Sequence, residues 1–276
     1  MLKKTAQIAA VLALAVSLAS AADTKTPSGL SAATIVEKNV AARGGLQSWR
    51  AVQTLTMTGK MDAGGNTRPT LAISSPSTKK GAALAPPRPK DQVQLPFTME
   101  LKRPRKSRLE IEFKGQKALQ VFDGTNGWKL RPFLNRHQVE PYSPDETKAT
   151  ALQSDLDGPL VDYVAKGTKV ELVSTEKVQG RDAYKLKLTL QGGHVQHIWV
   201  DTKTFLEAKI EGTPRRLDGK MHAVATYPSD YRAVSGVTVP FLLETAAEGV
   251  KQTEKIQIQS VVVNPKLDDS AFAKPN

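Results

Sequence analysis

FTMELKRPRKSRLEIEFKGQKALQVFDGTNGWKLRPF, the stretch at residues 97–133, decides the fold class of this 276-residue chain. Apolar and polar residues alternate on both sides of a Lys-Arg-Pro break at residues 102–104. Alternation with a period of two is typical of strands that bury one face. Asp123-Gly124 then supplies the turn signal that joins antiparallel neighbours. The stretch therefore predicts a series of antiparallel strands.

The same alternation continues towards both ends of the chain. Leu55 and Met57 alternate with threonines before the stretch, and further candidate strands follow it with turn signals between them. These candidates lie at residues 170–178, 183–190, 195–201, 206–212, 222–234, 237–247 and 251–264. The total of about eleven strands predicts an all-β barrel or a curved sheet. Strands and helices do not alternate along the chain, which argues against a parallel sheet.

Residues 32–50 show a helical pattern instead. Ile35, Val36 and Val40 fall on one face of a helix. Gly44-Gly45 interrupts the pattern, so we expect two helical pieces with the glycine pair between them.

Residues 143–166 interrupt the strand pattern a second time. Ser143-Pro144 followed by two acidic residues is a helix start. An apolar face is supplied by Leu152, Leu156, Leu160, Val161 and Val164. Gly158-Pro159 is expected to split the segment into two short helices, because proline has no amide N–H to donate to the preceding turn of a helix.

The first 21 residues have the composition of a cleaved signal peptide. Lys3 and Lys4 precede an apolar run that is too short to span a bilayer, and residues 19–21 fit a cleavage site. The chain has no cysteine, so it lacks the residue that carries the lipid of a bacterial lipoprotein. We therefore expect an exported, soluble periplasmic protein that is not lipid-anchored. Residues 22–276 form its single expected domain, with a flexible loop at residues 62–96 that is rich in Gly, Pro, Ser and Lys.

The formal net charge is +12, and about +10 without Lys3 and Lys4. Basic and acidic residues are intermixed, which favours a solvated surface; attraction to an anionic membrane or an acidic partner is the alternative. Aromatic residues make up only 5% of the chain, and no nucleic-acid recognition motif accompanies the charge. Nucleic acid is therefore not an expected partner.

The sequence contains no motif of a nucleophile elbow, a phosphate loop or a dinucleotide site. His194 and His197 would fall on opposite faces of a strand, which argues against a metal pair. Asp155 and Asp157 are two residues apart, so on a helix they would be separate surface charges. We therefore expect a protein that is not an enzyme and that uses neither a metal nor a cofactor.

Several short motifs, taken in order, resemble the periplasmic outer-membrane lipoprotein carriers of the LolA-like superfamily. They are the Lys-Arg-Pro break after a strand, Asp123-Gly124 followed by Gly127-Trp128, then Pro132-Phe133, and an ending from Asn264-Pro265 to Phe272. The resemblance implies a mainly β fold with α: an unclosed antiparallel β half-barrel, capped by an N-terminal helix and central lid helices over an apolar cavity. The length of the segment at residues 62–96 and the basic charge place the chain among the broader relatives rather than with the dedicated carrier.

The resemblance also implies a function. The carriers take acylated lipoproteins from an inner-membrane releasing complex to an outer-membrane receptor. We therefore expect a monomeric carrier or chaperone that binds the acyl chains of lipoproteins, or another lipid, for outer-membrane lipoprotein sorting. Two alternatives use the same fold: a periplasmic domain for envelope-stress sensing and interaction, and a lipid-modifying hydrolase.

The expected site consists of a latch and a lining. Arg103, the arginine of the Lys-Arg-Pro motif, corresponds to the residue that holds the lid over the empty cavity in the carriers. The candidate lining residues of the cavity are Met57, Met99, Leu101, Leu109, Ile111, Leu119 and Trp199. The alternative role for each of them is ordinary core packing beneath the helices.

Overall fold

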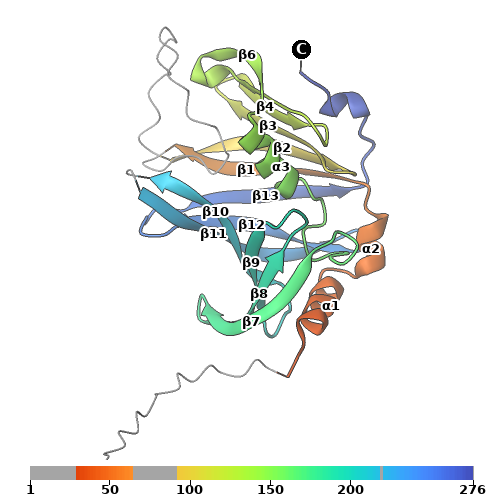
Figure 1. The fold of residues 1–276 in the computed structure, drawn as a ribbon. Coiled ribbons are helices and arrows are strands. Elements are labelled where there is room, and N and C mark those ends of the chain that lie inside the picture. Colours follow the sequence, from red (N-terminus) through yellow and green to blue (C-terminus); the bar gives the residue numbers. More distant parts are fainter. Residues whose placement is uncertain (1–28, 65–91, 218–219, 276) are drawn as a thin grey trace, which may run out of the picture.

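The computed structural model describes residues 29–64, 92–217 and 220–275 (Figure 1). The expected signal peptide and residues 65–91 of the expected loop lie outside this part. The expected loop was too wide at both ends, because strand β1 (Thr54–Gly64) continues to residue 64 and strand β2 (Gln92–Lys102) begins at residue 92. Ala63 pairs with Val93, so the main-chain hydrogen bonds of β1 and β2 continue into residues whose composition predicted a loop.

The glycine pair divides the first helical segment as expected. Helix α1 (Ala32–Ala42) begins at Ser31, whose side chain accepts a hydrogen bond from the Thr34 amide, and helix α2 (Leu46–Ala51) follows the pair. Helix α3 (Pro144–Gln153) starts at the expected Ser143. Two short 3₁₀ helices complete the helical elements of the described residues: η1 (Pro132–Leu134) and η2 (Asp269–Phe272).

Thirteen strands of the described residues form one sheet, in which every neighbouring pair is antiparallel. Besides β1 and β2 they are β3 (Lys106–Phe113), β4 (Gln116–Phe122), β5 (Gly127–Arg131), β6 (Arg136–Pro141), β7 (Lys169–Val178), β8 (Arg181–Thr189), β9 (Val195–Asp201), β10 (Glu207–Leu217), β11 (Lys220–Val234), β12 (Val237–Ala247) and β13 (Glu254–Val263). The mainly β fold class is confirmed. β6 was not among the expected strands, because its residues do not alternate.

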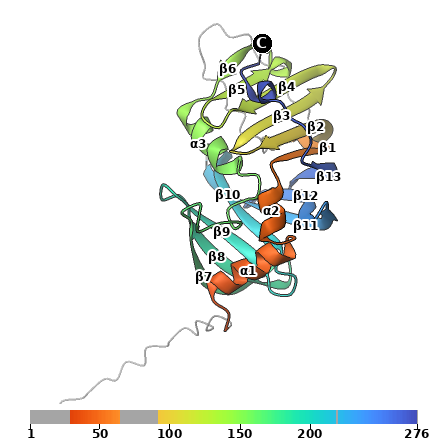
Figure 2. The same cartoon turned by 90° about the vertical axis from the view of Figure 1, so that its right-hand side faces the viewer.

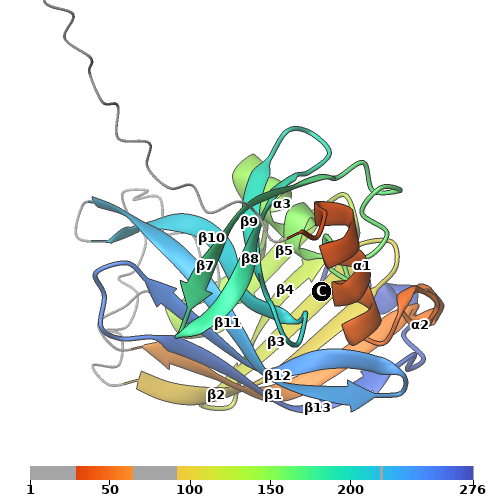
Figure 3. The same cartoon turned by 90° about the horizontal axis from the view of Figure 1, so that it is seen from below.

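The order of strands across the sheet is β6-β5-β4-β3-β2-β1-β13-β12-β11-β10-β9-β8-β7. β6 and β7 follow each other in the sequence but lie at opposite edges, so the sheet is curved and does not close into a barrel. Figure 3 shows this curve end-on, with α1 beside its open side. The connection from β6 to β7, residues 142–168, has to pass from one edge to the other, and it carries α3.

One hydrophobic core fills the concave side of the sheet. It joins strands of both halves to Ile35 and Val36 of α1, Trp49 of α2, and Leu160 and Val161 of the β6–β7 connection. The helices and this connection therefore cover the concave face, as Figure 2 also shows for α1 and α2. Each apolar side chain of this kind contributes about 1.5–3 kcal/mol when it is fully buried.

The second half of the β6–β7 connection differs from the expectation. α3 forms with a complete capping box between Ser143 and Glu146, but residues 154–167 form turns and no second helix. Gly158 has a φ of +75°, a conformation that interrupts a helix, and Pro159 follows it. We call residues 154–167 the cap segment. Leu156, Leu160 and Val161 of the expected apolar face are buried, whereas Leu152 and Val164 are exposed.

The turn between α1 and α2 is fixed against the β11–β12 turn. Gly44 and Gly45 have φ values of +106° and +90°. A Cβ on Gly44 would lie 2.2 Å from the carbonyl oxygen of Gly236, whereas a Cβ on Gly45 would meet nothing within 4 Å. The main chain of Thr238 also donates to the carbonyl of Arg43 (2.8 Å). Gly44 is therefore required both by backbone conformation and by close packing.

Gly44→Ala is expected to destabilise the protein more than Gly45→Ala. The alanine at position 45 costs only backbone strain of about 1–3 kcal/mol, and the alanine at position 44 adds a steric clash with the strand turn. Urea unfolding of the two variants and the wild type measures the difference. Equal losses of unfolding free energy would contradict the close contact with Gly236.

Candidate functional site

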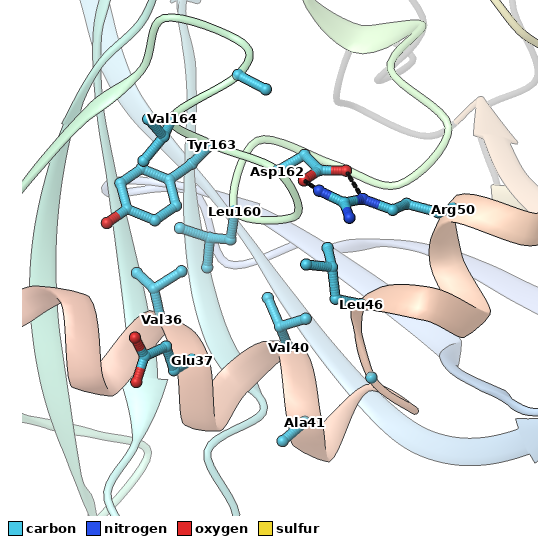
Figure 4. Close-up of a pocket in the computed structure, with 12 residues that line it drawn as sticks. Val36, Glu37, Val40, Ala41, Leu46, Arg50, Leu160, Asp162, Tyr163 and Val164 are labelled. Atoms are coloured by element: carbon cyan, nitrogen blue, oxygen red, sulfur yellow. Dashed lines mark hydrogen bonds and ion pairs between the residues drawn. The ribbon is translucent and has the colours of Figure 1, made fainter.

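An apolar groove lies between the two N-terminal helices and the cap segment (Figure 4). Its volume is about 530 Å³. It is lined by Val36, Glu37, Val40, Ala41, Gly45, Leu46, Arg50, Leu160, Asp162, Tyr163, Val164 and Ala165. Val164 is the most exposed large apolar residue of this lining, since 72% of it is accessible. The lining is mainly apolar apart from Glu37 and one charged edge, which suits an apolar guest.

A bidentate ion pair spans that edge of the groove. Arg50 of α2 donates from Nε to Asp162 Oδ2 (2.9 Å) and from Nη2 to Asp162 Oδ1 (2.6 Å). Arg50 is half exposed, so solvent screens the pair and its contribution to stability is small. It joins α2 to the cap segment but cannot hold the segment down by itself.

Asp157 is the buried anchor of the cap segment. Its carboxylate, 1% exposed, accepts hydrogen bonds from Arg103 Nη2 (2.6 Å) and from Lys166 Nζ. Lys166 also donates to the carbonyl of Gly158 (2.7 Å) and pairs with Asp155 (2.8 Å). A buried carboxylate with two cationic donors is strongly held, because each donor offsets part of the cost of burying its charge.

Two of the three aspartates of the cap segment, Asp155 and Asp157, have pKa values that are shifted in opposite directions. Burial opposes the ionisation of Asp157, but the hydrogen bonds from Lys166 and Arg103 outweigh it and lower the pKa of its carboxyl. Burial, together with the neighbouring charge of Asp157, raises the pKa of Asp155 despite its contact with Lys166. The carboxyl of Asp157 therefore stays ionised to lower pH than that of Asp155. The expectation that both residues are plain surface charges was wrong for Asp157.

Arg103 lies where a latch residue would lie. It occupies the turn between β2 and β3, and its side chain crosses to α2 and the cap segment. Besides Asp157, it donates to the carbonyl oxygens of Val52 (Nε, 2.8 Å) and Trp49 (Nη2, 3.1 Å). The planar guanidinium makes these contacts at once, which the single ammonium of a lysine cannot do. Its contacts thus join the β2–β3 turn to the end of α2 and to the cap segment.

Five of the seven predicted lining residues share the concave face. Met57 pairs with Met99, and Met99 pairs with Leu109, so their side chains lie in one row across the sheet. Leu101 and Ile111 lie two residues away on the same face. Leu109 and Ile111 belong to the buried core, and the other three residues pack against it. The sheet, however, contributes no residue to the lining of the groove described above.

The other two predicted lining residues lie on the opposite face. Leu119 pairs with Glu110, whereas the adjacent pair, Ala118 with Ile111, belongs to the core. Trp199 pairs with Lys185, whereas its neighbours Ile198 and Val200 enter the core. Including these two residues was therefore an error of strand register, since one step along a strand moves a side chain to the other face.

Trp199 instead belongs to a small outer cluster with Val178, Ala183, Ala208 and Tyr227. The ammonium groups of Lys185 and Lys209 lie 5.2 and 4.1 Å from the centre of its ring. These lysines explain how a tryptophan on the outer face is almost fully covered.

Sequence analysis missed the polar residues that hold the cap segment. Arg103 reaches Asp157, and Arg50 reaches Asp162, only through the tertiary fold, so the sequence gives no signal of these pairs. Gly158-Pro159 was the available sign, because it argues against a helix that continues through the cap segment. Within the described residues, no three His, Asp or Glu side chains gather as a metal site. No helix in this part is long and apolar enough to cross a membrane.

Comparison with solved structures finds proteins of similar fold, among them a LolA superfamily protein. A LolA superfamily protein from Nitrosomonas europaea is 14% identical, with a TM-score of 0.54 over 89% of this chain and 98% of that one. An outer membrane lipoprotein-sorting protein domain from Vibrio parahaemolyticus is 12% identical, with a TM-score of 0.53 over 88% and 96%. A DUF1329 family protein from Desulfovibrio piger is 15% identical, with a TM-score of 0.53 over 88% and 97%.

The fold of this chain is thus similar to the folds of these proteins, which is the fold class that the sequence motifs implied. No protein-family model matches it, and the search of curated proteins finds no match. The likeness covers most of the chain, so it includes both halves of the sheet and the helices between them.

Asp157→Asn is expected to destabilise the protein at pH 7 by about 3–5 kcal/mol, because it removes one member of a buried charge cluster. The pKa of Asp157 is lower in the folded protein than its ordinary value of about 3.9. Its stabilising contribution is therefore complete above that ordinary value and is lost as pH falls through the folded-state pKa. Urea unfolding at several pH values should show the two proteins converging in acid.

Asp155→Asn is the matched control for this prediction. The raised pKa of Asp155 means that its ionised form is disfavoured in the folded protein, so its removal should change the unfolding free energy at pH 7 far less. Equal losses in both variants would contradict the assignment of Asp157 as the anchor.

Proposed function

We propose that the protein is a non-enzymatic periplasmic carrier that shelters the acyl chains of lipoproteins, or of another lipid, for sorting to the outer membrane. The observation that carries the proposal is the apolar groove beneath a cap segment that is held by polar contacts rather than by a continuous helix. The likeness of the fold to a LolA superfamily protein and to a lipoprotein-sorting domain supports it. The proposed partners are an inner-membrane releasing complex and an outer-membrane receptor, and the proposed carrier acts as a monomer.

The groove has the properties that a reversible acyl site needs. Its volume of about 530 Å³ lies within the range of about 300–1,000 Å³ for small-molecule sites. Each CH₂ group removed from water contributes about 0.8 kcal/mol, so a chain of about sixteen carbons needs on the order of 12 kcal/mol of shelter. The groove is open on one side, and a fuller enclosure requires the cap segment to move.

Displacement of the cap segment would also uncover the concave face of the sheet. Leu160 and Val161 lie in the same core cluster as Leu109 and Ile111, and Met57, Met99 and Leu101 pack against that cluster. These five sheet residues are the proposed floor of the enlarged cavity. The flexible methionines suit a surface that must pack against the protein when empty and against a guest when filled.

Arg103 is the proposed latch of the empty state. Its contacts with α2 and with Asp157 stabilise the closed cap segment and are absent from any state in which the segment has moved away. A guest that needs the open state must overcome this stabilisation, so the latch lowers its apparent affinity and speeds its release. The latch thus favours transfer over storage.

Arg103→Leu is expected to bind a fluorescent fatty acid more tightly and to release it several-fold more slowly than the wild type. Lys166 still pairs with Asp157 in this variant, which protects the fold. Stopped-flow transfer of the probe to vesicles measures the release rate. Arg108→Leu is the control, because it removes an arginine from the opposite face of the adjacent strand. Equal release rates in both variants would show that Arg103 is not a latch.

Val164→Glu is expected to weaken probe binding about tenfold or more, because it places a charge against the apolar guest. The residue is 72% exposed, so its replacement should leave the unfolding free energy nearly unchanged. Val262→Glu, at a valine that is 48% exposed on β13, adds the same charge away from the groove. Saturable binding that is insensitive to both changes would move the site elsewhere, and an absence of saturable binding in the wild type would end the carrier proposal.

A further inference from the structure

A second arginine holds the cap segment from the other side. Arg43 ends α1, and its side chain is only 11% exposed. Its Nη1 lies 3.0 Å from the main-chain carbonyl oxygen of Asp157 and 3.4 Å from Glu207 Oε1. The guanidinium also packs 4.5 Å from the centre of the Trp49 ring, which fixes its plane. Arg43 thus joins α1, α2, strand β10 and the cap segment.

Asp157 is therefore bound by arginines at two different groups, its carboxylate and its main-chain carbonyl. Arg103 holds its carboxylate from the β2–β3 turn, in the half of the sheet that ends at β6. Arg43 holds its carbonyl group and is itself paired with Glu207, in the half that ends at β7. The cap segment crosses between these halves, so the two guanidinium groups fix it to both.

Glu207 is tied to the sheet by a further contact. The hydroxyl of Tyr231 on β11 lies 3.0 Å from the Glu207 carbonyl oxygen and 3.1 Å from its Oε2, so it donates to one or the other. Burial, with the nearby Glu207 carboxylate, raises the pKa of the Tyr231 phenol, which keeps it a neutral donor. The carboxylate that faces Arg43 is consequently held in one place, and Arg43 is held with it.

We infer that Arg43 is a positioning residue that holds the cap segment in place. The cap segment opens the groove only when the contacts of Arg43 and of Arg103 with Asp157 are both released. The role of this opening in cargo binding rests on the proposed function, whereas the grip itself does not. Because both contacts involve Asp157, their release should let the cap segment move as one unit.

A purely structural role for Arg43 would be to neutralise Glu207. The two roles separate in a background where Glu207 carries no charge. Glu207→Gln leaves Arg43 an acceptor on the side chain and its contact with the Asp157 carbonyl. Arg43→Met in that background removes the contact without leaving a buried carboxylate unpaired. The comparison of Glu207→Gln with Arg43→Met/Glu207→Gln therefore measures the grip on the cap segment.

Hydrogen exchange of the cargo-free protein is the test. Amides of Gly158, Lys166 and Gly167 donate hydrogen bonds within the cap segment and report its opening. The double variant should exchange them about tenfold or more faster than Glu207→Gln, the effect of losing a hydrogen bond from a charged donor. Amides of β8, which lie in the core of the same half, should be unchanged. Arg50→Met, which removes an exposed contact with the same segment, should have an effect of under about fivefold.

Two results would overturn the inference. One is equal exchange of the cap segment in the two Glu207→Gln backgrounds. The other is a rise in exchange of the same size in β8, which would mean that Arg43 stabilises the whole fold and not the cap segment. The fatty-acid probe gives the second readout, since faster association is expected in the double variant. If no variant binds the probe, the carrier proposal fails, and the exchange rates still decide the role of Arg43.

Discussion

The connection between the two edge strands has to cross the concave side of an unclosed sheet, and the rest of the structure follows from this constraint. The crossing chain cannot pair with either half, so it needs other contacts. Leu160 and Val161 supply apolar contacts with the core, and Asp157 supplies the polar ones. Asp157 accepts hydrogen bonds at its carboxylate from Arg103 and at its main-chain carbonyl from Arg43, so it joins the connection to both halves. Solvent competes poorly for these contacts, because the anchor is buried.

Local patterns were enough for the fold class. Alternation identified most strands, Gly44-Gly45 divided the first helical segment, and the Ser143 cap marked the start of α3. The non-helical cap segment was missed because its leucines and valines keep a helical spacing while Gly158-Pro159 breaks the helix. The ends of β1 and β2 were missed because ladder pairing extends strands through residues of low β propensity.

The site was harder to predict than the fold. Arg103 was identified by resemblance, and five lining residues shared a face because alternation is local. Leu119 and Trp199 were misplaced, since a strand pattern gives two faces but not which of them is covered. The pairs of Glu207 with Arg43 and of Asp157 with Arg103 could not be predicted, because their members lie 164 and 54 residues apart along the chain. Buried charge clusters of this kind are set by the tertiary fold and cannot be inferred from spacing.

The central position of β13 has a consequence for the order of folding. This late strand lies between β1 and β12, with Leu55 opposite Val263 and Leu242 opposite Gln257. Until it is in place, the hairpins on either side form two unconnected half-sheets, each with an unsatisfied edge. Joining them closes a loop of some two hundred residues, so it is a slow, late event. Newly made chains consequently expose unpaired strand edges for longer than a simple meander would. A chaperone that shields these edges would raise the yield of native protein.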